Sequence, residues 1–307
     1  MNEAAVDSVR LLPNGGWDPR LLICRCAPTV DSFIVITARY VILIDTLINP
    51  ATAEALLAIA KPHLRDARTL LVINTHADWD HCWGNQLFAG ADAVAPAPIL
   101  ATARCAPRFG AEMAAKLAAQ RDADPGRFDL VRPVAPTVLF DERLTIDGGD
   151  LTLELFPTPG HTDDHLAMYI PELALLLAGD AAEEPFPFAT TVDALPPLRA
   201  SLGAMMALQP REAFYCHAPE RSGPVLLARN IAYFDALEWH CREALARGVA
   251  SATEDGDELE RYVGWRFQEA IGGDRQASVL PQMYHRGHQR HIRLMLDWVQ
   301  QDNSLSQ

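Results

Sequence analysis

The sequence is poor in positive charge and in long apolar runs. It has 26 lysine and arginine residues against 40 aspartate and glutamate residues, which gives a formal net charge of −14. Such a surface repels polyanions, so neither nucleic acid nor an anionic membrane is an expected partner. The apolar run from Ile34 to Ile48 is interrupted by Arg39 and Asp45 and is too short to cross a bilayer.

The six cysteines have neither the spacing of a disulfide framework nor that of a zinc finger. We expect them to be small buried residues in a reducing compartment, which predicts a cytoplasmic location. The N-terminal segment carries acidic residues and no apolar core, so no secretory signal is expected. A small molecule is the expected substrate, and a second copy of the chain is an open alternative as a partner.

The remaining composition, 307 residues with 49% hydrophobic and 21% charged side chains, is typical of a globular protein with a large core. The pattern predicts a strand-rich domain over 1–223 and a helical C-terminal extension over 224–307, packed on the same domain. Strands are predicted within 21–48, 70–76, near 93, and within 143–157, 166–180 and 213–217. Helices are predicted at 51–60, 82–88, 97–120, 197–208, 224–247, 256–271 and 286–301.

The strongest chemical signal is the segment Thr75-His76-Ala77-Asp78-Trp79-Asp80-His81, which places four potential metal ligands directly after an apolar strand. In extended geometry His76, Asp78 and Asp80 point the same way, and a turn can aim His81 at a second ion. Such a concentration of carboxylate and imidazole groups needs a cation to offset its repulsion.

Four further polar residues follow apolar runs at predicted strand ends. They are Asp45, His161 in Pro-Gly-His-Thr, Asp180 in Ala-Gly-Asp, and His217 in Cys-His-Ala-Pro. Because strand ends meet at the edge of a sheet, these side chains can converge on the 76–81 segment. Any one of them alone is more often a cap or a hydrogen-bonded polar group than a ligand.

The segments THADWDH, PGHT and AGD, followed by an isolated strand-end histidine, resemble the metallo-β-lactamase superfamily, whose usual signature is His-x-His-x-Asp-His. The resemblance covers residues 20–220. It implies a mixed α/β fold in four αββα layers: two mixed sheets face to face, helices outside, and a dinuclear metal site at one edge.

The resemblance also implies a set of metal ligands. One ion would be held by His76, Asp78 and His161, the other by Asp80, His81 and His217, and Asp180 would bridge them. Asp45 would stand behind these ligands and orient one of them.

Asp78 departs from the signature, because most members have histidine at that position. Zinc is the first expectation for the two divalent ions, and the harder carboxylate leaves iron or manganese as alternatives. The flavodiiron oxygen and nitric oxide reductases are similar in carrying glutamate there. They also carry a flavodoxin domain, for which this chain has no phosphate loop. Asp78→His is expected to shift metal preference toward zinc.

The predicted activity is hydrolysis by a hydroxide shared between the two ions, with a small ester, lactone or thioester as substrate. Asp80 and Asp180 are the candidate catalytic carboxylates, and either water or a carboxylate such as Asp80 protonates the leaving group. A diiron redox protein and a non-catalytic metal-bound binding module are the alternatives.

Weaker candidates surround this set. His165 either lines the mouth of the site or is a core or surface histidine, and Trp79 and Trp83 either wall the pocket or anchor their loop. Phe186 and Phe188 shape a substrate cavity or are ordinary packing under a loop. The tail histidines 285, 288 and 291 are expected on a solvated basic face or an ion-pair seam.

Overall fold

The structure is a computed structural model that describes residues 7–27, 30–91, 93–248, 255–272 and 280–305. The chain forms two compact units: unit 1 contains Met1–Pro157 and Asp164–Gly179, and unit 2 contains Thr158–Asp163 and Asp180–Gln307. The predicted domain boundary at 223/224 stays a prediction. Residues 1–6, the first part of the N-terminal segment in which no secretory signal is expected, lie outside the described residues.

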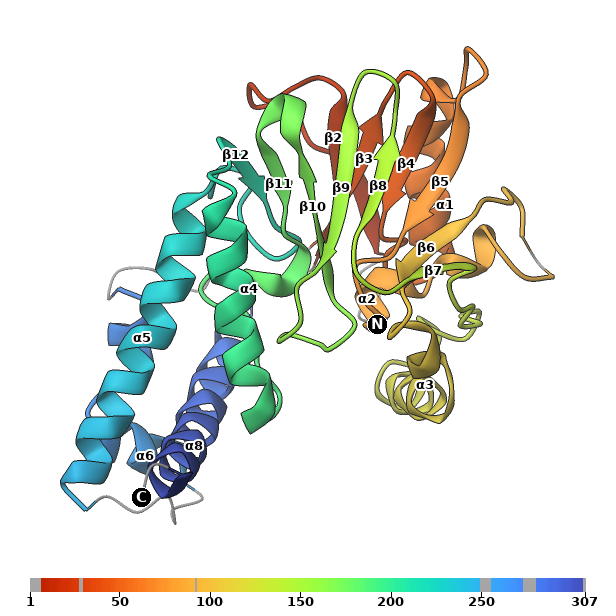
Figure 1. The fold of residues 1–307 in the computed structure, drawn as a ribbon. Coiled ribbons are helices and arrows are strands. Elements are labelled where there is room, and N and C mark those ends of the chain that lie inside the picture. Colours follow the sequence, from red (N-terminus) through yellow and green to blue (C-terminus); the bar gives the residue numbers. More distant parts are fainter. Residues whose placement is uncertain (1–6, 28–29, 92, 249–254, 273–279, 306–307) are drawn as a thin grey trace. The chain divides into compact units, whose positions relative to one another are not determined.

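Unit 1 contains a seven-stranded sheet whose strands follow one another in sequence order (Figure 1). Neighbours pair antiparallel from β1 to β4 and parallel from β4 to β7. The strands are β1 (Ser8–Leu11), β2 (Leu21–Ala27), β3 (Val30–Ile36), β4 (Tyr40–Ile44), β5 (Thr69–Ile73), β6 (Ile99–Thr102) and β7 (Val138–Phe140). All seven residues of β3 are buried, so both faces of the sheet are covered there.

The parallel half of this sheet positions chemical groups at one edge. Because β4, β5 and β6 run in the same direction, the residues that follow them emerge at the same side of the sheet. Asp45 follows β4, and the segment from Thr75 to His81 follows β5. Asp45 has a positive φ of 65°, a left-handed conformation that turns the chain sharply as it leaves the strand.

A second, antiparallel array in unit 1 has the order β11-β10-β9-β8. Its strands are β8 (Leu144–Asp147), β9 (Thr152–Pro157), β10 (Leu166–Ile170) and β11 (Leu175–Leu177). Backbone hydrogen bonds connect it to the larger sheet at both ends. Arg39 N donates to the carbonyl of Gly148 at 3.0 Å, and Leu166 N donates to that of Thr75 at 2.9 Å.

The helices of unit 1 are α1 (Pro50–Ala60), α2 (Trp79–Cys82) and α3 (Ala111–Ala123). Helix α1 is well specified locally, because Asn49 caps it in a reciprocal capping box with Thr52, and Pro50 fits the first turn. It supplies the crossover that parallel pairing of β4 and β5 requires.

Unit 2 is mainly helical, with α4 (Leu195–Ala207), α5 (Val225–Ala246), α6 (Gly256–Val263), α7 (Phe267–Ala270) and α8 (Pro281–Leu305), and it also contains β12 (Glu212–Phe214). Helix α5 packs against α4, α6 and α8 (Figure 1). The long helices bury residues such as Leu227, Phe234, Leu237, Ile292 and Leu296. None of the described helices is both long and apolar enough to span a membrane.

Most predicted elements are present, but the segment from 82 to 120 differs. The helix predicted at 82–88 is the short α2 followed by a 3-10 turn at Asn85–Leu87. The strand predicted near 93 is absent there, and β6 lies at Ile99–Thr102, inside the region predicted as an alanine-rich helix. Parallel pairing with β5 and β7 overrides the local helix propensity of that segment.

Candidate metal centre

The segment after β5 presents its four candidate ligands as two pairs. The chain bends at Thr75 and Ala77, and the extended residue Asp78 comes directly before α2. Asp80 and His81 therefore lie in the first turn of a helix and not on a continued strand. His76 Nε2 lies 3.6 Å from Asp78 Oδ2, and His81 Nε2 lies 3.8 Å from Asp80 Oδ1. Two donors bound to one tetrahedral zinc ion at ~2.0–2.1 Å are about 3.4 Å apart, so each pair has nearly the spacing of shared ligands.

Asp45 sets the orientation of both histidines. Its Oδ2 lies 2.8 Å from Nδ1 of His81 and accepts a hydrogen bond from Thr75 Oγ1 at 2.8 Å. Because that hydroxyl gives its proton to Asp45, it can only accept from Nδ1 of His76, which lies 3.0 Å away. These partners place the proton of each ring on Nδ1 and leave each Nε2 with a lone pair, the form that binds a metal ion.

Asp164, at the start of the segment leading into β10, holds the same loop from the other side. Its Oδ2 accepts from the backbone N–H of Ala77 at 2.8 Å, and its Oδ1 pairs with Arg108 at 2.6 Å. Arg108 also contacts Asp78 Oδ1 at 3.1 Å. Burial opposes the charged form of this guanidinium, but Asp164 and Asp78 raise its pKa above the ordinary value.

The weaker candidates of unit 1 lie in packed surroundings. His165 is fully buried, and its ring centroid lies 5.0 Å from that of His76. Trp83 is also fully buried and donates through Nε1 to Met113, while Trp79 packs edge-on against Phe128. These contacts anchor the loop, which is one of the two roles that the sequence left open for the tryptophans.

Unit 2 brings together the other three candidate ligands. Oδ2 of Asp180 lies 3.7 Å from Nε2 of His161 and 3.2 Å from Nε2 of His217. One carboxylate oxygen of Asp180 thus faces both imidazoles, and its role as a bridge between two ions stays a prediction.

The loop that carries His161 is fixed by a close backbone approach. Gly160 has a φ of +139°, and a Cβ added there would lie 2.3 Å from Cα of Leu198 on α4. Ser201 of the same helix donates its hydroxyl to the carbonyl of Pro159 at 2.8 Å. Only glycine fits at position 160, which explains the Pro-Gly-His sequence.

Glu183 is a buried carboxylate that sequence reasoning missed. Its Oε1 faces Nδ1 of His161 at 3.5 Å, and its Oε2 accepts a hydrogen bond from the hydroxyl of Tyr284 at 2.8 Å. Burial and the neighbouring charge of Asp180 raise the pKa of Glu183 to about 7. A cation bound nearby would lower it again.

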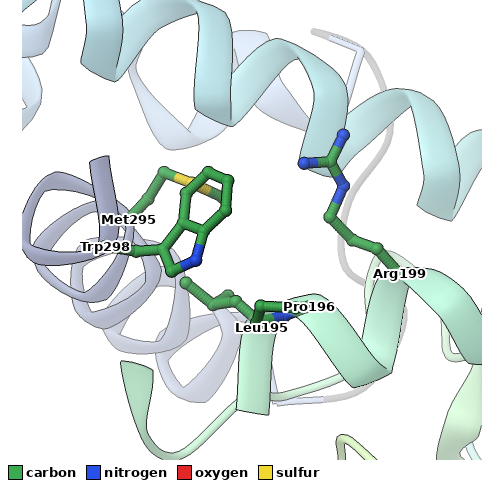
Figure 2. A pocket seen from close by; sticks show the side chains of 5 residues that line it. All are labelled: Leu195, Pro196, Arg199, Met295 and Trp298. Carbon is green, nitrogen blue, oxygen red and sulfur yellow. The ribbon is translucent and has the colours of Figure 1, made fainter. Parts of the chain in front are cut away.

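The aromatic residues after Asp180 are packed inside unit 2. Phe186 is fully buried and stacks on Tyr233 with ring centroids 4.2 Å apart, and Phe188 stacks on Tyr284 at 5.0 Å. This arrangement is the ordinary packing that was the alternative to a cavity-shaping role. The cavity described in unit 2 has about 200 Å³ and lies between α4 and α8. It is lined by Leu195, Pro196, Arg199, Met295 and Trp298, none of them a candidate ligand (Figure 2).

The solvated basic face predicted for the tail histidines is wrong for two of them. His288 and His291 are fully buried, and Nδ1 of each ring lies within 3.1 Å of the Tyr233 hydroxyl. His285 is half-exposed and pairs with Glu260 at 2.7 Å, as the ion-pair alternative predicted. Helical spacing alone could not show that this stripe faces the interior of unit 2.

The donor set in each unit fits divalent metal ions. Imidazoles and carboxylates are ligands for zinc, and the carboxylates also suit iron and manganese. The histidines and carboxylates available are His76, Asp78, Asp80 and His81 in unit 1 and His161, Asp180 and His217 in unit 2.

The family model described as the metallo-beta-lactamase superfamily matches residues 28–217, more than half of the chain. The chain therefore belongs to this superfamily, and the predicted fold class, a mixed α/β fold with two sheets and a helical C-terminal region, is confirmed. No curated protein matches the sequence significantly.

Solved structures show the same fold at low identity. A metallo-beta-lactamase from Pontibacter korlensis is 19% identical with a TM-score of 0.56, over 74% of this chain and 99% of that one. A metallo-beta-lactamase family protein from Thermus thermophilus is 22% identical, with a TM-score of 0.56, over 91% of this chain and 93% of that one.

The stereoselective inverting sec-alkylsulfatase Pisa1 from Pseudomonas sp. is 18% identical, with a TM-score of 0.64, over 94% of this chain. This chain spans 50% of the length of the alkylsulfatase. A match over 94% of the chain includes more residues than 1–223 contain. The shared fold therefore extends into the C-terminal helices.

Proposed function

We propose that this protein is a metal-dependent hydrolase that acts on a small ester, lactone or thioester through two divalent ions, with zinc as the first candidate. The carrying observation is that each unit supplies donor pairs at ligand spacing, all within residues 28–217 of the superfamily match. Assembly of these donors into one dinuclear centre, with Asp180 as its bridge, is part of the proposal.

Two bound divalent ions would supply a water molecule of lowered pKa as nucleophile and an electrophile for the substrate oxygen. The chain's own residues would prepare this centre. Asp45 and Thr75 keep the lone pairs of His76 and His81 on Nε2. Asp80 would take up the proton that the attacking water releases and pass it to the leaving group, with water as the alternative donor. The net charge of −14 disfavours polyanionic substrates.

Sulfate esters are a second candidate substrate class. The shared fold with a sec-alkylsulfatase, which extends over 94% of this chain, favours their inclusion. One substrate panel that contains both acyl esters and alkyl sulfates separates the two candidates.

The test is elemental analysis of protein purified without added metal, paired with that panel of aryl esters, lactones, thioesters, alkyl sulfates and phosphodiesters. We expect about two zinc ions per chain and turnover of acyl or sulfate esters. Iron with dioxygen or nitric oxide reduction would favour the diiron alternative. Phosphodiester turnover alone would eliminate the proposed substrate class, and no turnover with any metal would favour a binding module.

We also propose a cytoplasmic location, because all six cysteines are buried free thiols. Cell fractionation tests this. A homodimer is a further proposal, which light scattering of the purified chain checks; a monomer at all concentrations would contradict it.

A further inference from the structure

Glu183 is held by two helices of the C-terminal region. Asn230 on α5 accepts from the backbone N–H of Glu183 at 3.1 Å and donates to its carbonyl at 2.9 Å. Tyr284 on α8 donates its hydroxyl to Oε2 at 2.8 Å. Only 2% of Glu183 is exposed, so its backbone and one carboxylate oxygen are fixed inside unit 2.

The other carboxylate oxygen is directed at a candidate ligand. Oε1 of Glu183 is buried and accepts no hydrogen bond from the described residues, and it faces Nδ1 of His161 at 3.5 Å. On the opposite side of that ring, Nε2 faces Asp180. A carboxylate that meets the distal nitrogen of a ligating imidazole fixes the ring's tautomer and raises its basicity.

We propose that Glu183 is a positioning residue for His161, and that Tyr284 makes the C-terminal helix α8 a working part of the metal centre. This inference rests on the proposed function, because it takes His161 as a ligand. The side chain accepts the Nδ1 proton, and Nε2 is left to bind the ion. The proposal requires Nδ1 of His161 and Oε1 of Glu183, which lie 3.5 Å apart, to approach to hydrogen-bond distance when the ion binds.

The test is metal affinity, measured by competition of the metal-free protein with a chromogenic zinc chelator. Glu183→Gln keeps the shape but removes the negative charge, and we expect affinity for the ion that His161 would bind to fall about tenfold or more. Tyr284→Phe removes only the hydroxyl, and we expect a smaller loss in the same direction. The visible absorption bands of the Co²⁺-loaded protein should change in both variants, because the orientation of one ligand changes.

Matched controls are Glu184→Gln, at the neighbouring carboxylate that pairs with Arg229, and Tyr262→Phe, which removes a hydroxyl that donates to Glu258. Both should bind zinc as the parent does. Unchanged affinity and Co²⁺ bands in Tyr284→Phe and Glu183→Gln would overturn the inference while the parent still binds two ions. If the parent itself binds no metal, the proposed function fails instead.

A second inference concerns Asp78, which stands where most members of the superfamily have a neutral histidine. Its Oδ2 faces His76 Nε2 at 3.6 Å, while its Oδ1 contacts Lys116 Nζ at 2.8 Å and Arg108 at 3.1 Å. Arg108 is also paired with Asp164 and Glu112. Asp78 is therefore the carboxylate that matches the charge of Lys116 on α3.

We infer that Asp78 and Lys116 together replace the neutral imidazole: one carboxylate oxygen faces the metal position and the other carries the compensating cation. The pair has the same net charge as a histidine. Asp78→His, from sequence alone, should restore the common signature. With Lys116 in place it instead leaves an unmatched positive charge beside the ions.

This charge rule is tested by a four-variant cycle with zinc affinity as the readout. Asp78→His should weaken binding about tenfold, and adding Lys116→Met to it should recover most of that loss. Lys116→Met alone should bind as tightly as the parent or more tightly. Lys61→Met, in the exposed turn after α1, is the control and should change nothing. The inference would be overturned if Asp78→His bound zinc as tightly as the parent and if adding Lys116→Met did not change that affinity.

Discussion

In unit 1 the ring nitrogens of two histidines are reached from the ends of adjacent parallel strands, by Asp45 and Thr75. In unit 2 the ring of His161 is faced by Glu183, which sits on a loop and is held by α5 and α8. The first arrangement is built by the sheet that carries the ligands. The second depends on helices that are distant in sequence, so it should respond to changes far from the ligands.

The largest expected effect is on metal content. Asp180→Asn removes the charge of the one carboxylate that faces both His161 and His217. We expect at least one of two ions to be lost or displaced, because an amide is a poor bridge between cations. Elemental analysis of the purified variant measures this, and unchanged content would mean that the ligand assignment is wrong. Asp150→Asn, in a surface turn, is the control.

A large stability effect is expected in unit 1 from Arg108→Met. It leaves the fully buried Asp164 without its guanidinium, and removing one partner of a buried pair costs about 3–5 kcal/mol. Arg39→Met breaks an exposed pair with Asp147 and should cost about 0–1 kcal/mol. Chemical unfolding of both variants compares them, and equal losses would contradict the structural role of Arg108.

Unit 2 should be the more acid-sensitive region. Burial lowers the pKa of His288 to about 4 and of His291 to about 3. Unfolding exposes both rings, which then bind protons with a pKa of about 6.5, so the free energy of unfolding should fall as pH drops from about 6.5 toward 3. The expected loss is on the order of 3 kcal/mol for His288 and 5 kcal/mol for His291.

His291→Gln sharpens this test, because glutamine can still accept from the backbone N–H of Ala189 but takes up no proton. Urea unfolding followed by far-ultraviolet circular dichroism, which reports the loss of helix, gives stability at each pH. The parent should lose more stability than the variant between pH 6.5 and about 4. Parallel pH profiles would refute the prediction.

The smallest effect is expected from Thr75→Val, which removes the hydroxyl between Asp45 and His76 while keeping the shape. Zinc affinity should fall by less than tenfold, because His81 keeps its direct contact with Asp45. Thr145→Val, at an exposed position on β8, is the control. Equal zinc affinity in the two variants would mean that the Thr75 hydroxyl does not orient His76.

The sequence could indicate the candidate ligand segments because the signals for them are local. Asp45, the 76–81 cluster, Asp180 and His217 follow apolar runs, and the fold follows from those runs and the motif that resembles the superfamily. Strand β6 was missed because pairing on both sides, and not its own residues, makes it a strand.

Glu183, Asp164 and Arg108 could not be predicted in the same way. Their partners lie far along the chain: Tyr284 is 101 residues from Glu183, and Arg108 is 56 residues from Asp164. A pair of acidic residues in Asp-Ala-Ala-Glu-Glu was the only local signal for Glu183, and such pairs are ordinary surface features. The burial of His288 and His291 likewise depends on a contact with Tyr233, which lies on another helix.

Asp45 has one further consequence. Its carboxylate contacts His81 directly and His76 through the Thr75 hydroxyl, so the two rings share one negative charge. An ion that polarises either ring draws on that common charge and alters the basicity of the other. Occupancy of one position should therefore be communicated to its neighbour through the protein, without any movement of the chain.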